Sequence, residues 1–225
     1  MRFGFAIIAL LSGFMLDAAE YEPTTNWPYV YEEFIPGHVK THQGADISYD
    51  KLNVNLVSGR VHYVEDGVIM QADLNTIALL SIADDSWMCV GGRMMKVLRN
   101  TAQSAVLLRM TIDTDAMNSA DIGYGKSSIA STSNLSLVAL SSGMDYSVNR
   151  SIDDLQRERY DGQPLEIREV CGIYYKGTFV PATRTDVLKI PGIDKDAVKQ
   201  YLKTEKIKFN RTDDLARLAD FLYTL

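Results

Sequence analysis

Short apolar stretches separated by turn residues run through much of the chain, and this pattern constrains the fold more than any other feature. Between Lys51 and Val57, every second residue is apolar, which is the period of a half-buried strand. Ser58-Gly59 and Asp66-Gly67 follow as turn signals between neighbouring stretches of this kind. Further strands are expected at the same spacing up to residue 112 and again at 167–180. The series predicts a mainly β (α+β) fold, an antiparallel meander that is either open or curled towards a barrel.

The last part of the chain, residues 183–225, has a helical period instead. Asp194 can cap a helix that places Val198 and Leu202 on one face. Thr212 opens a second helix, with acidic residues in its first turn and leucines at helical spacing. We therefore expect two C-terminal helices packed on the sheet.

The first 19 residues have the layout of a secretory signal. Met1-Arg2 gives a positive start, residues 3–16 are uncharged and apolar, and Asp17-Ala18-Ala19 offers small residues for cleavage. The apolar run is shorter than the roughly 20 residues that a membrane-spanning helix needs. A buried helix or an uncleaved anchor is the alternative. We expect an exported protein of the periplasm or cell surface, without a transmembrane segment after signal cleavage.

The remaining chain divides by composition into three parts. Residues 20–36 are rich in aromatics and proline, and residues 37–182 hold the predicted strands. Within this β-rich part, residues from about 115 to 150 are dominated by Ser, Gly and Asn and predict a flexible loop. Residues 183–225 form the helical segment.

The overall charge of the chain is acidic, with a formal net charge of −6. Nucleic acids bind preferentially to basic surfaces, so we expect no nucleic-acid partner for an acidic chain. Ile190-Pro191-Gly192-Ile193 is similar to the hairpin of helix-hairpin-helix DNA-binding motifs, but Asp194 stands where the motif has a second glycine. A carboxylate at that place would repel phosphate.

The two cysteines, Cys89 and Cys171, are too far apart in sequence to form a CxxC motif. In an oxidising compartment they can form a disulfide, which is one hypothesis. The alternative is two buried thiols that pack as small apolar groups.

The sequence holds no recognisable catalytic or cofactor motif. It has three histidines, His38, His42 and His62, without HExxH spacing, and we expect them to face solvent on strands. No GxSxG elbow occurs, and Gly123-Tyr124-Gly125-Lys126-Ser127 lacks the first glycine of a phosphate loop. We predict no catalytic residues, no metal and no cofactor. The alternative is an envelope hydrolase that uses acids brought together from different strands.

Four aromatic side chains cluster near the start of the mature chain: Trp27, Tyr29, Tyr31 and Phe34. Exposed aromatic rings stack on sugars and anchor protein interfaces, so these four are the candidate partner-binding residues, for an envelope protein or a glycan. The alternative is that they belong to the core.

Several segments together resemble uncharacterised exported proteins of Bacteroidota-type Gram-negative bacteria. The similar segments are Trp27-Pro28-Tyr29, residues 52–56, His62-Tyr63, residues 91–98, residues 124–128 and residues 206–210. The resemblance implies a Gram-negative envelope setting and carries no activity or site residue across. From these observations we predict an exported, non-catalytic binding or scaffolding module.

Overall fold

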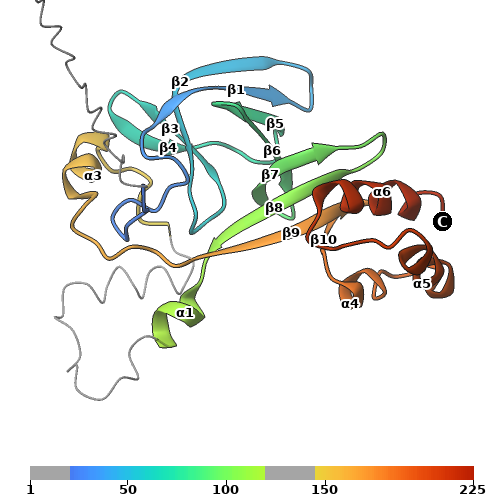
Figure 1. Cartoon of the computed structure of the whole chain (residues 1–225). Coiled ribbons are helices and arrows are strands. Elements are labelled where there is room, and N and C mark those ends of the chain that lie inside the picture. The colour runs from blue at the N-terminus through green and yellow to red at the C-terminus, as the bar shows by residue number, and fades with distance from the viewer. Residues whose placement is uncertain (1–20, 120–144) are drawn as a thin grey trace, which may run out of the picture.

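The structure is a computed structural model that describes residues 21–119 and 145–225 (Figure 1). The described residues form ten strands in one antiparallel sheet, in the order β10-β9-β8-β7-β6-β5-β1-β2-β3-β4. The strands are β1 (Ile35–Thr41), β2 (Asp46–Val54), β3 (Val61–Glu65), β4 (Val68–Gln71), β5 (Ile77–Ile82), β6 (Asp85–Val90), β7 (Arg93–Asn100), β8 (Ala105–Ile112), β9 (Ile167–Tyr175) and β10 (Thr178–Pro181).

The helices lie between β8 and β9 and after β10. They are α1 (Thr114–Ser119), α3 (Ile152–Glu158), α4 (Arg184–Val187), α5 (Lys195–Thr204) and α6 (Thr212–Leu222). None of the described helices is long and apolar enough to cross a membrane.

One core lies inside the curl of the first seven strands. Leu52, Val61, Leu80 and Trp87, which come from β2, β3, β5 and β6, are at most 1% exposed and pack in one cluster. The start of β7 approaches the β2–β3 turn, where Met94 N–H donates to the carbonyl of Gly59 at 2.7 Å. The sheet therefore curls strongly at this end but stays open.

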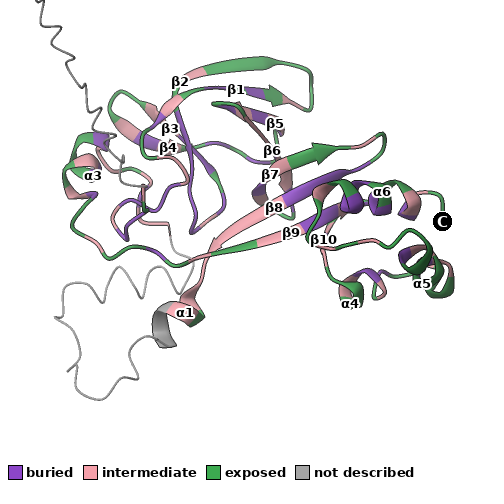
Figure 2. Cartoon of the chain, in the orientation of Figure 1, coloured by how far each residue is buried: buried purple, intermediate pink, exposed green. Residues whose placement is uncertain are grey.

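A second core lies between the C-terminal helices and strands β8, β9 and β10. Figure 2 shows the buried residues of α6 facing buried residues of β8 and β9. Val106 and Ile173 from the sheet meet Leu218 and Leu222 of α6, and all four are fully buried. The apolar residues that recur at helical spacing in the sequence are those that the helix turns towards this core.

The predicted mainly β fold is confirmed, as an open antiparallel sheet with helices packed at the C-terminus. The turn at Asp66-Gly67 joins β3 and β4 into a hairpin, and the turn at Lys176-Gly177 joins β9 and β10. All four turn residues have positive φ. This backbone conformation matches the twist of the flanking strands.

Three short helices add to the predicted pattern: α1 and α3 lie where we expect none, and α4 lies in the helical segment before the two helices that we predict there. Each has seven residues or fewer, which is too short for a helical repeat to be visible in the sequence. The helix α1 lies at the start of the predicted Ser/Gly loop. Residues 120–144 of that loop, and the predicted signal at 1–19, lie outside the described residues.

One strand also begins and ends earlier than its sequence pattern predicts. Alternation predicts a strand from Lys51 to Val57, whereas β2 spans Asp46–Val54. The side-chain oxygen of Asn55 accepts hydrogen bonds from the N–H groups of Val57 and Ser58, both at 2.9 Å. Such a turn around an Asn side chain bends the chain out of the sheet.

Candidate functional site

The four aromatic residues predicted to bind a partner are packed inside the protein. Trp27, Tyr29 and Phe34 are 1%, 0% and 8% exposed, and their rings meet edge to face at centroid distances of 4.9 to 5.8 Å. Tyr31 is half-buried, and its hydroxyl donates to the Asp85 carboxylate at 2.8 Å. Their burial corrects the prediction of an exposed platform, because Trp27, Tyr29 and Phe34 fill the space between the sheet and α3, and Tyr31 packs against the core of the curled strands.

Beside this aromatic cluster, a buried histidine joins two segments that are distant in sequence. The His62 ring is fully buried, which corrects the expectation that it faces solvent. His62 Nδ1 lies 2.9 Å from the Tyr29 hydroxyl, and Nε2 lies 2.9 Å from Asp145 Oδ2. Ser58 Oγ donates to the same carboxylate oxygen at 2.8 Å, and Ser147 N–H donates to the other at 3.0 Å.

The electrostatics of this network favour a charged carboxylate and a neutral phenol. Burial alone would raise the pKa of Asp145, but His62, the Ser58 hydroxyl and the Ser147 N–H together hold it below its ordinary value. Burial raises the pKa of Tyr29 far above its ordinary value, so its hydroxyl stays protonated. The Tyr29 hydroxyl lies within hydrogen-bond distance of Nδ1 of His62, while Nε2 faces the Asp145 carboxylate.

An acid and a histidine therefore meet here, and such a pair, like two acids, is an arrangement on which a hydrolase could depend. The hydrolase alternative also needs the two groups to be open to a substrate. Here the ring is sealed from solvent, and both its nitrogens face protein atoms. The arrangement holds residues 145–147 against β3 and offers no free base. That the chain is not an enzyme stays a prediction.

The two cysteines are both free thiols. Cys89 lies on β6 and Cys171 on β9, and strands β7 and β8 lie between them. Three strand spacings amount to about 14 Å, which is twice the Cα separation that a disulfide allows. Both thiols are free but half-buried rather than buried, and this partial burial raises the pKa of both above the ordinary value.

Among residues 21–119 and 145–225, no group of three or more His, Cys, Asp or Glu side chains could hold a metal ion.

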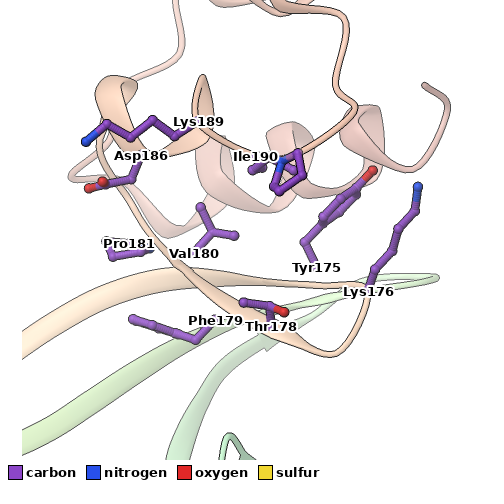
Figure 3. A pocket seen from close by; sticks show the side chains of 10 residues that line it. Tyr175, Lys176, Thr178, Phe179, Val180, Pro181, Asp186, Lys189 and Ile190 are labelled. Atoms are coloured by element: carbon purple, nitrogen blue, oxygen red, sulfur yellow. The ribbon is translucent and has the colours of Figure 1, made fainter.

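A groove of about 420 Å³ lies along β10, where the sheet ends (Figure 3). Tyr175, Val180 and Ile190 are its buried apolar residues. The other residues that line it are Lys176, Thr178, Phe179, Pro181, Asp186, Lys189 and Pro191. The close view places Lys176 and Lys189 at opposite sides of this groove, which we call the β10 groove.

The backbone of β10 presents hydrogen-bonding groups at this edge. In the register with β9, Thr178 pairs with Tyr175 and Val180 with Ile173, and Ala182 N–H donates to Cys171 at 2.9 Å. Antiparallel strands turn alternate residues inward and outward, so the N–H and C=O of Phe179 point away from β9. Pro181 has no N–H, and its carbonyl already accepts from Thr183 N–H at 2.7 Å.

The opposite wall of the groove is fixed by helix caps. Thr183 caps α4, with its hydroxyl accepting from Asp186 N–H at 3.0 Å. The chain turns at Gly192, which has φ of 75°, and α5 then begins at the Asp194 cap. The Asp194 carboxylate accepts from the N–H groups of Asp196 and Ala197, both at 3.0 Å. Those donors are thus occupied at the point where a helix-hairpin-helix motif would offer them to phosphate.

Sequence reasoning missed the β10 groove, although one signal for it was present. A Lys-Gly turn and a strand of four residues that ends in proline follow one another at 176–181. Proline in a sheet is confined to edges and strand ends, so this order indicates an edge strand. Nothing in the pattern indicates that the following segment leaves a cavity beside that edge.

No known family model matches this chain, and neither the curated proteins nor the solved structures contain a significant match to it.

Proposed function

We propose that this chain is an exported, non-catalytic binding module that takes an extended polypeptide segment into the β10 groove. The observation that carries the proposal is the backbone of β10, which no other segment among residues 21–119 and 145–225 covers, beside an apolar cavity. An extended peptide can add to such an edge through main-chain hydrogen bonds, while side-chain pockets give specificity.

The dimensions and lining of the groove support this mode of binding. Its volume of about 420 Å³ falls within the range of small-ligand sites. Tyr175, Val180 and Ile190 offer an apolar surface to alternate side chains of the guest. The outward N–H and C=O of Phe179 can pair with one residue of its backbone.

Peptide selection from a displayed library of random twelve-residue sequences tests the proposal. Thr178 is exposed and lines the groove, and a tryptophan there fits a strand but obstructs the cavity. We expect peptides selected on the wild type to lose at least tenfold in affinity for Thr178→Trp. Ser48→Trp is the matched control, because Ser48 is exposed on β2 outside the groove.

Three results would count against the groove as a peptide site. They are the absence of any selected peptide, equal binding to wild type and Thr178→Trp, or an equal loss with Ser48→Trp. Circular dichroism and thermal unfolding of both variants establish that each is folded before binding is compared.

Export is the second part of the proposal and has its own test. We expect the full chain, expressed in a Gram-negative host, to appear in the periplasmic or surface fraction with its first 19 residues or so removed. Mass spectrometry of the purified chain gives the new N-terminus. An intact chain in the cytosolic fraction would overturn this part alone.

A further inference from the structure

We propose that the β10 groove selects an acidic guest, an extended segment with carboxylates on both sides of an apolar centre. This inference rests on the proposed function and adds the chemical class of the partner. Its basis is the charge around the groove.

The two lysines of the groove are available to a guest. Lys176 and Lys189 are both exposed, and neither forms an ion pair with any residue in the described parts of the chain. The ammonium of Lys176 lies 4.9 Å from the centroid of the Tyr175 ring, so its stem runs along the apolar floor. Figure 3 shows the two ammonium groups on opposite sides of the cavity.

The acidic residues around the groove are already engaged. Asp186, the carboxylate of the lining, accepts from the Thr183 hydroxyl at 2.7 Å. Asp194 caps α5, and Asp196 pairs with Lys199 at 2.9 Å. The lining therefore carries two lysines against one carboxylate, and neither lysine forms an ion pair with that carboxylate.

The wider distribution of charge agrees with this local picture. Residues 183–225 contain 9 Lys and Arg against 7 Asp and Glu, whereas residues 20–182 contain 13 against 21. The C-terminal segment beside the groove is thus the basic part of an acidic chain. Complementary potentials steer a charged partner towards its site and disfavour partners of like charge.

A second copy of this chain is the competing occupant of the edge. Isologous pairing brings the same surface of both copies together, so two grooves that each hold two lysines and one carboxylate would face each other with the same net positive charge. An acidic peptide satisfies the same backbone groups and removes this repulsion. The charges therefore favour the acidic peptide.

Fluorescence anisotropy with three labelled seven-residue peptides tests the inference on the full chain. The peptides share the centre Thr-Val-Thr-Val-Thr and carry Glu, Gln or Lys at both ends. We expect the Glu peptide to bind about fivefold more tightly than the Gln peptide, and the Lys peptide to bind weakest. The advantage of the Glu peptide should shrink as salt is raised from 50 to 500 mM, because exposed charges are screened.

Paired charge variants locate the effect. Replacing both groove lysines, as Lys176→Gln with Lys189→Gln, should abolish the difference between the Glu and Gln peptides. The matched control is Lys40→Gln with Lys51→Gln, two exposed lysines of β1 and β2, and it should keep the difference. Lys189→Glu should reverse the preference towards the Lys peptide.

The outcomes separate the two proposals. Equal binding of all three peptides, each weakened by Thr178→Trp, would overturn the acidic selectivity and leave the peptide groove standing. Failure of all three to bind, or binding that Thr178→Trp does not weaken, would overturn both. A wild-type dimer that Thr178→Trp converts to a monomer would assign the groove to a second copy and overturn the acidic guest.

Discussion

The two edges of the sheet differ in how they are covered. Residues 149–152 cover the β4 edge, whereas no described segment covers the β10 edge. At β4, Ile69 N–H donates to the Arg150 carbonyl at 2.9 Å and the Ile69 carbonyl accepts from Asn149 N–H at 2.8 Å. Residues 149–152 thus occupy the β4 edge. At β10, the backbone of Phe179 has no such cover in the described chain. An uncovered edge is a surface on which another strand can pair.

The covered edge depends on buried polar and apolar groups that pack against one another. Asp145 lies just before the covering segment, where His62 and Ser58 hold it, and Ile152 and Leu155 pack into the aromatic cluster after it. A buried polar network is costly when one partner is lost. We therefore expect changes at the β4 edge to cost stability and changes at the β10 edge to cost binding.

The largest effect is expected from Asp145→Ala. The change leaves His62 Nε2 without its partner and the Ser58 hydroxyl with only Asn55 Oδ1, and we expect the free energy of unfolding to fall by about 3 kcal/mol. Denaturant unfolding measures this loss. Amide exchange at Ile69 should also become faster, because the backbone that covers β4 is no longer held.

The control for this variant is Ser58→Ala, which removes one hydrogen bond to the carboxylate and keeps His62 in place. We expect it to cost about 1 kcal/mol. Equal costs for the two variants, or unchanged exchange at Ile69, would show that Asp145 does not hold the cover of the β4 edge.

A smaller loss is expected at the open edge from Gly172→Ala. A Cβ at this position of β9 would lie 2.4 Å from the Phe179 ring and 2.6 Å from the Val180 carbonyl oxygen. Displacing the ring should cost about 2 kcal/mol in denaturant unfolding and weaken peptide binding, since Phe179 lines the groove. In a Phe179→Ala background the same change should cost less, and an unchanged cost would contradict the ring as its cause.

The sequence predicts the hairpin turn next to each edge, but it does not predict whether other residues cover that edge. The Asp66-Gly67 and Lys176-Gly177 hairpins are visible because residues side by side in the chain determine them. The contact between His62 and Asp145 depends on tertiary packing, so His62 has the pattern of an ordinary strand residue. For the same reason, the aromatic run could not be assigned to core or surface from composition.

The acid sensitivity of the covered edge is the next effect in size. The pKa of Asp145 is lower in the folded chain than its ordinary value near 3.8. Its stabilising contribution is therefore complete above pH 4 and declines as pH falls through the lower folded value. We expect the stability difference between wild type and Asp145→Asn to narrow below pH 4, as measured by denaturant unfolding. A difference that stays constant from pH 7 to pH 3 would contradict the charged pairing.

The smallest effect concerns the two thiols. It tests whether β7 and β8 lie between β6 and β9, and thus keep the open edge away from the curled core. A bond between Cys89 on β6 and Cys171 on β9 would require the sheet to fold over β7 and β8, and the open edge would then move towards the curled core. With the strands in the observed order, no bond can form. Chain purified under oxidising conditions and unfolded without reductant should release two thiols to a thiol-reactive dye. Its unfolding midpoint should be unchanged by reductant. A titre of zero thiols, restored to two by reductant, would contradict the strand order and the comparison of edges that depends on it.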